Sequence, residues 1–302
     1  MGDAEKNVLL KVEDLSIGFS QYLKGTQKRI IRPIANMHVE IGEGEIVAVV
    51  GASGSGKSLL AHAVLGILPG NAICSGKMLY RGEELTEERK KRLRGSEISF
   101  IPQSVNYLDP LMRVGRQVQI GLDRKIAKKK QEELFVQYGL QERDGRLFPF
   151  ELSGGMLRRV LFATSVREGV KLVIADEPTP GIHPQALSEI LRQLKQFAAD
   201  GAGVMLITHD IVSALGIADR VAVLKDGTTI EISDAAAFAG NGELLQSEYT
   251  RRLWRALPQN DFDPEWKERG VGKLGFSWRE SGLLLSERSL DTAGHKHLDC
   301  PG

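Results

Sequence analysis

A glycine-rich segment directly after a continuous apolar run constrains the fold of this chain more than any other feature. The run covers residues 46–50 (IVAVV), and the glycine-rich segment covers residues 51–58 (GASGSGKS). A continuous β-branched run predicts a strand that is buried on both faces, as in a parallel sheet. Residues 58–68 then predict an apolar helix that ends before Pro69. Strand, glycine-rich loop and helix in this order are typical of a phosphate-binding loop.

The residue types of this loop suit the binding of a nucleotide through its phosphates. Glycines let successive backbone N–H groups converge on phosphate oxygens, and the following helix adds the partial positive charge of its N-terminus. Lys57 can reach the terminal phosphates, and the hydroxyl of Ser58 can ligate Mg²⁺. A plain glycine–serine turn is the alternative, but the strand before the loop and the helix after it weigh against that reading. The predicted nucleotide contacts are Gly51, Ser53, Gly54, Ser55, Gly56, Lys57 and Ser58.

Two acidic residues, Asp176 and Glu177, follow a second apolar strand over residues 172–175. The carboxyl ends of parallel strands meet at the edge of the sheet where phosphate loops lie. We therefore expect Asp176 to hold Mg²⁺, partly through water, and Glu177 to polarise an attacking water. An acidic turn after a core strand is the alternative, and the phosphate loop makes it the weaker one.

Two further polar residues follow predicted strands. His209 comes after the apolar strand over residues 204–208, and Gln103 comes shortly after a short strand over residues 98–101. His209 is a candidate contact of the γ-phosphate, and Gln103 is a candidate contact of Mg²⁺ or of the attacking water. Either residue alone would be interpreted as structural, so both assignments depend on the neighbouring loop and carboxylates.

A second helix start, at residues 152–156 (LSGGM), has the features of an anion-binding site. Ser153 suits the N-cap position, and Gly154 and Gly155 leave backbone N–H groups open to an anion. A capped helix start is the structural alternative. It does not explain a second anion-binding helix in a chain with one phosphate loop. If the two cannot meet within one chain, two chains must meet head to tail.

Strands that alternate with helices predict a parallel α/β sheet for most of the chain. We expect a first strand over residues 8–19, a loop or hairpin over 21–32, and a charged helix over 83–94. The helical block between residues 101 and 171 interrupts the alternation and is interpreted as an inserted subdomain. The pattern weakens after about residue 244.

Charge and hydropathy narrow the classes of partner. The 302 residues contain 40 Lys and Arg against 39 Asp and Glu, a net charge of +1, whereas nucleic-acid-binding domains usually have a clear basic excess. We therefore expect no nucleic-acid partner. No apolar run is long enough for a transmembrane helix, and the first residues do not resemble a secretory signal. Two cysteines far apart in sequence predict neither a disulfide framework nor a cysteine metal site, as is usual in a reducing cytoplasm.

These motifs together resemble the ATP-binding subunit of an ABC transporter. Five motifs occur in the family's order: the Walker A loop at residues 51–58, the Q-loop residue Gln103, the signature at residues 152–156, the Walker B acids and the His209 switch. The resemblance covers residues 8 to about 245. It implies the α/β fold class, with a P-loop NTPase core of the ABC ATPase type, an antiparallel β part and an inserted helical subdomain. The implied domains are an ABC nucleotide-binding domain over 1–245, with its helical subdomain at about 104–170, and a C-terminal extension over 246–302.

The resemblance also implies the ligands and their contacts. Two molecules of ATP, with Mg²⁺, would be sandwiched between the Walker A loop of one subunit and the signature of the other. Phe19, or alternatively Tyr22, matches the aromatic residue that stacks on adenine. The implied catalytic residues are Glu177, His209 and Gln103, the implied metal ligands are Ser58, Gln103 and Asp176, and the signature contacts are Ser153, Gly154 and Gly155.

A finer resemblance points to the importers of peptides and nickel. Met156 stands where other branches have glutamine, and residues 108–110 and 247–258 resemble further elements of this branch. The implied function is an ATP-hydrolysing subunit at the cytoplasmic face of the membrane, bound peripherally to permease subunits and supplied by a separate solute-binding protein. The alternative is an ABC-type ATPase subunit of a non-transport complex, in DNA repair, translation or multi-enzyme assembly.

One stretch departs from the family pattern. After the Walker B acids, residues 180–183 read PGIH, so His183 stands where the family usually has an interface aspartate. This departure fits a subunit built for a heterodimer with a second ABC ATPase, although a homodimer stays open.

Overall fold

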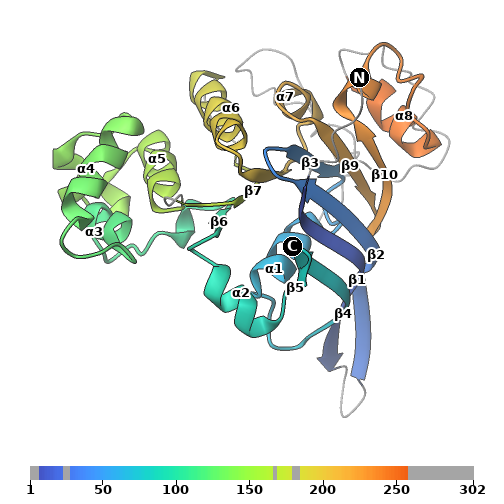
Figure 1. Cartoon of the computed structure of the whole chain (residues 1–302), viewed down its shortest axis with the longest axis horizontal. Coiled ribbons are helices and arrows are strands. Elements are labelled where there is room, and N and C mark those ends of the chain that lie inside the picture. Colours follow the sequence, from blue (N-terminus) through green and yellow to red (C-terminus); the bar gives the residue numbers. More distant parts are fainter. Residues whose placement is uncertain (1–6, 23–27, 166–168, 179–183, 258–302) are drawn as a thin grey trace, which may run out of the picture.

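Two β-sheets form the framework of the computed structural model, which describes residues 7–22, 28–165, 169–178 and 184–257 (Figure 1). The first sheet is antiparallel, in the order β2-β1-β4-β5, and comprises β1 (Val8–Tyr22), β2 (Lys28–Gly42), β4 (Ala72–Tyr80) and β5 (Glu83–Glu84). The second has the order β10-β9-β3-β8-β7-β6 and comprises β3 (Ile46–Gly51), β6 (Ile98–Ile101), β7 (Leu172–Asp176), β8 (Gly203–Ile207), β9 (Arg220–Lys225) and β10 (Thr228–Asp234). In this second sheet only the β9–β10 pair is antiparallel.

The central strands of the second sheet are buried on both faces, as their continuous apolar runs predict. Side chains of β3 alternate between two hydrophobic clusters: Ile46 and Val50 belong to one, and Val47 and Val49 to the other. The second of these clusters fills the space between the two sheets and around α1. Because both faces are covered, polar residues on these strands concentrate at the strand ends, and this is where the candidate site lies.

Eight α-helices lie in the described part of the chain, and three of them form an arm (Figure 1). Figure 1 shows α3, α4 and α5 set to one side of both sheets. The helices are α1 (Lys57–Leu65), α2 (Glu87–Leu93), α3 (Val114–Gln119), α4 (Ala127–Gln137), α5 (Gly154–Ser165), α6 (Pro184–Ala199), α7 (Ile211–Leu215) and α8 (Glu248–Arg255), with 3₁₀ turns at Val105–Tyr107, Glu142–Arg146, Pro149–Glu151 and Ala235–Phe238.

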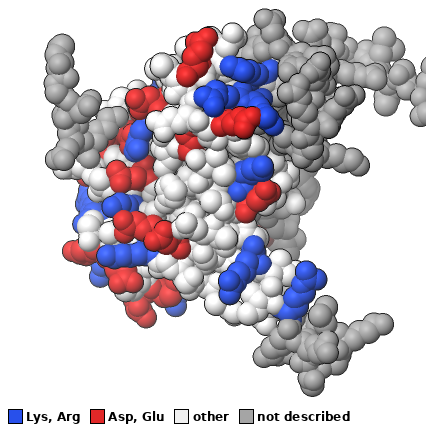
Figure 2. Space-filling view, turned by 90° about the vertical axis from the view of Figure 1, so that its right-hand side faces the viewer, with Lys and Arg blue, Asp and Glu red and all other residues white. Residues whose placement is uncertain are grey.

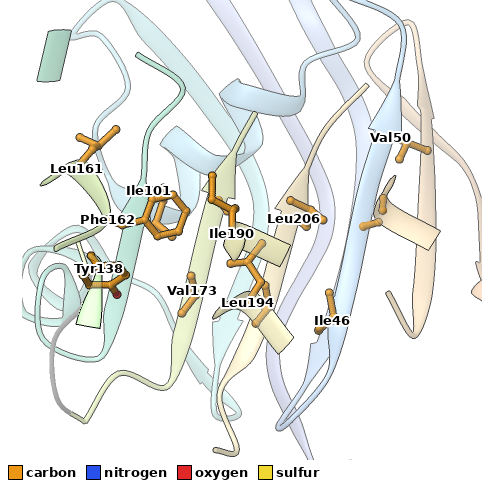
Figure 3. Packing of buried hydrophobic residues seen from close by; sticks show 14 of the residues in the cluster. Ile46, Val50, Ile101, Tyr138, Leu161, Phe162, Val173, Ile190, Leu194 and Leu206 are labelled. Carbon is orange, nitrogen blue, oxygen red and sulfur yellow. The ribbon is translucent and has the colours of Figure 1, made fainter. Parts of the chain in front are cut away.

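The arm shares a hydrophobic cluster with the parallel sheet. This cluster extends from Tyr138 and Phe162 of the arm to Val173 of β7 and on to Ile46 of β3 (Figure 3). The rings of Tyr138 and Phe162 lie with their centroids 6.3 Å apart. The helices between β6 and β7 are therefore held to the sheet by packed side chains as well as by the chain connections.

Two helix boundaries differ from those expected from the sequence. The helix after the phosphate loop ends at Leu65 because Gly66 adopts a left-handed conformation (φ 65°) and its N–H caps the last turn. The charged helix begins at Glu87, after Thr86, whose side chain accepts a hydrogen bond from the backbone N–H of Arg89. Residues 83 and 84, expected to be helical, instead pair with β4, a strand that the sequence analysis did not predict.

A buried glutamate joins β10 to the N-terminus of α8. Glu231 accepts hydrogen bonds from the backbone N–H groups of Gln246 (2.8 Å) and Ser247 (2.9 Å) and from the hydroxyl of Ser233 (2.6 Å). Burial alone would raise the pKa of the Glu231 carboxyl, but these hydrogen bonds outweigh it and hold the pKa below its ordinary value. The ionised carboxylate therefore stabilises the packing of α8 on β10.

We expect Glu231→Gln to lower the free energy of unfolding by about 1 kcal/mol at neutral pH, because an amide offers only one accepting oxygen. A lowered carboxyl pKa contributes stability that is present above the unfolded-state pKa and is lost as the pH falls through the folded-state value. The difference between wild type and variant should therefore shrink in acid. Urea denaturation at pH 7 and pH 4 measures both effects, with Glu248→Gln as a control on the exposed face of α8. A variant as stable as wild type at pH 7 would contradict the assignment.

Acidic and basic side chains are interleaved on the face that lies to the right in Figure 1. Figure 2 shows both signs distributed around a broad uncharged area. This mixture agrees with the net charge of +1 and gives that face no strong field of one sign. Among the described residues, no helix is long and apolar enough to cross a bilayer.

Candidate nucleotide-binding site

The glycine-rich loop connects β3 to α1, and two of its glycines are required by close packing. A Cβ at Gly51 would lie 2.4 Å from the carbonyl oxygen of Leu224, and one at Gly56 would lie 2.8 Å from Cγ1 of Ile34. Gly56 also has a left-handed conformation (φ 94°) as the N-cap of α1. At Gly54, also left-handed (φ 84°), a Cβ would meet no described atom within 4 Å. The loop is thus packed at both ends and open in its middle, where a ligand can approach the backbone.

Lys57, the first residue of α1, turns its side chain back into the loop. Its Nζ donates hydrogen bonds to the carbonyl oxygens of Gly51 (2.8 Å) and Ala52 (3.1 Å). Burial lowers the pKa of this ammonium group, and the negative charges of Glu177 and Asp176 oppose that shift. A buried cation between carbonyl oxygens and carboxylates is well placed to bind an anion entering the loop.

Asp176 ends β7 and is 3% exposed. Its Oδ1 atom is buried and has no hydrogen-bond partner among the residues that the structure describes. Burial raises the pKa of the carboxyl, and a hydrogen bond from the Ser58 hydroxyl and the nearby His62 and Lys57 side chains oppose that shift. An unpartnered buried carboxylate oxygen near a hydroxyl fits a hard cation such as Mg²⁺, which prefers oxygen ligands. In the described ranges no three His, Cys, Asp or Glu residues cluster as metal ligands.

Glu177 and His209 form a hydrogen-bonded pair beside this carboxylate. The distance between Glu177 Oε2 and His209 Nδ1 is 2.7 Å, and Glu177 is only 8% exposed. Glu177 has a left-handed backbone (φ 44°), and its N–H donates to the carbonyl oxygen of Ile207 at 2.8 Å, the last residue of β8. A non-glycine residue in this conformation stores local strain, which is common at functional sites. The neighbouring strands β7 and β8 thus bring two predicted residues into direct contact.

The Q-loop residue and the signature lie on the arm side of the parallel sheet. Gln103 is exposed just after β6, and its backbone carbonyl accepts a hydrogen bond from Nη1 of Arg158 at 2.7 Å. Ser153 accepts from the backbone N–H of Met156 at 3.3 Å, as an N-cap residue does. A Cβ added at Gly154 or Gly155 would meet no described atom within 4 Å, so the chain's own packing does not require glycine at either position.

The structure does not join every predicted residue to the site. Phe19 is partly buried and packs against the cluster between the two sheets, and it pairs with Ile31 and Ala72 across the antiparallel sheet. The side chain of Tyr22 and all of His183 lie outside the described part of the chain. The adenine contact therefore stays a prediction.

Arg158 is the site-adjacent residue that the sequence analysis missed. It lies 55 positions from Gln103 along the chain, and only the fold brings them together. Four arginines lie among residues 143–159, so composition gave no reason to select this one.

The strand β3, the glycine-rich loop and α1 follow one another as in P-loop nucleotide-binding proteins, with the ends of β7 and β8 nearby in the same sheet. The chain is a member of that class. Comparison with known families is more specific. The chain belongs to the ABC transporter family, whose model matches residues 34–180. The resemblance inferred from the motifs is thereby confirmed.

Relatives with assigned names agree with this family. The dipeptide transport ATP-binding protein DppD of Escherichia coli (strain K12) is 31% identical over 296 residues, which cover 93% of this chain and 88% of that protein. The oligopeptide transport ATP-binding protein OppD of Bacillus subtilis is 35% identical over 238 residues, which cover 74% of this chain and 65% of that protein. The match to the peptidoglycan transport ATP-binding protein YejF of Agrobacterium fabrum (34% identical) covers 86% of this chain and 49% of that protein, so the chain spans only part of some relatives.

Solved structures support the same fold. The dimeric ATP-binding cassette MJ0796, bound to ADP and Pi, has a TM-score of 0.65 to this chain at 25% identity, and the match covers 75% of this chain and 99% of that one. The predicted fold class, an ABC-type P-loop core with an antiparallel β part and a helical insertion, is confirmed by this match and by the two sheets and the arm described above.

Proposed function

We propose that this chain is the ATP-hydrolysing subunit that energises a membrane importer for peptides. The observation that carries the proposal is the Glu177–His209 pair at 2.7 Å beside the buried carboxylate of Asp176 and the loop that holds Lys57. These are the groups that phosphoryl transfer to water requires: a cation at the phosphates, an oxygen ligand for Mg²⁺ and a base for the water. The transport names of the relatives, DppD above all, support peptides as the solute.

The chain's own residues divide the chemistry among them. The loop N–H groups and Lys57 bind the phosphates and hold the terminal phosphate in place. Mg²⁺, held by Ser58 and Asp176 together with Gln103, would neutralise phosphate charge when bound. Glu177 accepts a proton from the attacking water or orients it. His209 holds the Glu177 carboxylate through Nδ1, and this leaves its Nε2 to face the γ-phosphate.

We infer that the signature acts on a second nucleotide, bound by a partner subunit. Ser153, Gly154 and Gly155 open α5 with N–H groups toward solvent, and a Cβ at either glycine meets nothing of this chain, which supports close approach of a ligand from outside. The partner is a related second ABC ATPase, and the assembly includes membrane permease subunits and a separate solute-binding protein. The chain works at the cytoplasmic face of the membrane, bound peripherally, with its nucleotide-binding domain over 1–245 and the extension over 246–302.

Reconstitution in proteoliposomes tests the transport function. The chain, its candidate partner ATPase and the permease are combined in vesicles with the ATPase side facing the lumen, and ATP is enclosed there. Uptake of a labelled peptide is followed after the peptide and the solute-binding protein are added outside. We expect uptake that depends on ATP and on this chain. Failure of the chain to copurify with a permease, together with ATP hydrolysis but no uptake, would overturn the importer assignment and leave the ATPase assignment standing.

A mixing experiment tests the heterodimer. The altered stretch at 180–183 would occur beside both nucleotides in a homodimer and beside only one in a heterodimer. Because a heterodimer keeps one stretch with the family's usual sequence, we expect this chain to dimerise, in the presence of ATP, with a related ATPase that has the usual aspartate. Light scattering of the chain alone, of the partner alone and of the mixture measures it. Efficient self-dimerisation and full ATPase activity of this chain alone, without gain from the partner, would exclude the heterodimer.

A further inference from the structure

A hydrogen bond links the exposed start of the loop after β6 to the signature helix, which also packs on this loop through apolar side chains. Arg158 projects from the second turn of α5, and its Nη1 donates to the backbone carbonyl oxygen of Gln103 at 2.7 Å. The acceptor is a main-chain atom, so the bond fixes the path of the loop and leaves the Gln103 side chain free to turn. Burial lowers the pKa of the guanidinium, and the described part of the chain provides no acidic partner for it.

Each end of this hydrogen bond lies next to a part of the proposed machinery. Gln103 follows β6, and β6 pairs with β7 at Ile101↔Ala175, one residue before Asp176. Arg158 lies five residues after Ser153, within the first turns of the helix that Ser153 caps. The Arg158 hydrogen bond therefore ties the exposed start of the loop to the helix that carries the signature glycines, in addition to the apolar packing of α5 on β6 and on the loop.

We propose that Arg158 is a positioning residue, which holds the signature end of α5 in a fixed relation to the Gln103 loop, so that the two ligand-facing parts move as one unit. This inference rests on the proposed function, because it assumes that the signature meets the nucleotide of a partner subunit. Arg158 touches neither nucleotide in this role. It acts on catalysis by the assembled pair and leaves nucleotide binding to the Walker A loop unchanged.

Another arginine of the arm provides a matched control. The Nη1 atom of Arg113 donates to the backbone carbonyl oxygen of Arg146 at 2.9 Å, and its guanidinium lies 5.4 Å from the ring centroid of Phe148. This bond has the same chemistry as that of Arg158, but both of its ends lie within the arm. Removing either arginine would loosen the arm in general. Only the removal of Arg158 would also weaken the connection between the arm and the edge of the sheet.

The test compares Arg158→Met, Arg158→Lys and Arg113→Met in the assembled ATPase pair. Methionine keeps an apolar stem without a donor, and lysine keeps a charge with a single donor group. We expect Arg158→Met to lower kcat about tenfold, because the variant loses one charge-assisted hydrogen bond. The KM for ATP and the affinity of the isolated chain for ATP should stay within about twofold of the wild-type values. Arg158→Lys should recover part of kcat, and Arg113→Met should leave kcat within about twofold of wild type. An unchanged kcat in Arg158→Met, or an equal loss in Arg113→Met, would overturn the proposal.

Amide hydrogen exchange of the isolated chain gives a second, activity-independent measurement. We expect the amides of residues 103–107 and of the first turn of α5 to exchange faster in both Arg158 variants and at the wild-type rate in Arg113→Met. If Arg158→Met does not fold, Arg158→Lys carries this comparison, and protection equal to wild type in both regions would reject the positioning role. Absence of ATP hydrolysis by the wild-type pair would instead reject the proposed function, and the exchange result would still decide whether Arg158 links the two segments.

Discussion

Glu177→Gln is expected to slow ATP hydrolysis by about 10²–10⁴-fold while ATP binding persists. Glutamine keeps the size of the side chain but cannot take a proton from water. The carboxylate it replaces is 8% exposed and lies 2.7 Å from the Nδ1 atom of His209, so its position is defined by the fold and not by solvent. The glutamine oxygen can still accept from His209, and the variant should therefore fold and bind nucleotide as wild type does.

Turnover is measured on the assembled transporter, with ATP binding measured in parallel on the isolated chain. Glu132→Gln, which changes a half-exposed carboxylate of the arm, is the control and should hydrolyse ATP at the wild-type rate. Near-normal turnover of the Glu177 variant would remove this residue from the role of general base. Loss of ATP binding together with turnover would indicate instead that Glu177 supports the phosphate loop through the charge of Lys57.

Lys57→Ala should weaken ATP binding at least tenfold. If both terminal phosphates lose a charge-assisted contact, the affinity should fall about a hundredfold, which corresponds to about 2.7 kcal/mol of binding free energy. The ammonium group donates to the carbonyl oxygens of Gly51 and Ala52, which holds it inside the loop where the phosphates are expected to bind. Its lowered pKa follows from burial, and the negative charge of the phosphates will favour the protonated form.

A titration with fluorescently labelled ATP measures the affinity, and circular dichroism checks that the variant is folded. Lys77→Ala removes an exposed lysine from the antiparallel sheet and should leave the affinity unchanged. Wild-type affinity in a folded Lys57 variant would contradict the phosphate-loop assignment as a whole, because no other cation in the loop could replace the missing charge.

The buried strands and the phosphate loop could be predicted because local sequence determines them. Successive side chains of β3 pack into two different hydrophobic clusters, so every position of the strand must be apolar. Residues 46–50 meet this requirement. Asp176, Glu177 and His209 were predictable as a group, because the ends of neighbouring parallel strands necessarily lie close together. Their exact relation, with Nδ1 of His209 on Oε2 of Glu177, depends on side-chain conformations that the pattern does not contain.

Other features could not be read from the sequence because they depend on distant partners. Strand β4 has a run of exposed residues and a glycine at position 76, so it lacks the apolar signal of a buried strand. Its pairing with β1 brings together segments about 60 residues apart. Helix α8 is short, and its start is held by Glu231 from another element. The Arg158–Gln103 contact is of the same kind.

The hydrophobic cluster that runs from Phe162 through Val173 to Ile46 has a consequence for the mechanics of the molecule. Elements that share a close-packed core melt together, so the arm and the parallel sheet should form one cooperative foldon in place of two independently stable bodies. Large excursions of the arm by local unfolding would expose that core to water. The arm is therefore confined to small shear displacements between interlocked side chains. A displacement at one end of the arm should move the packed part of the sheet with it.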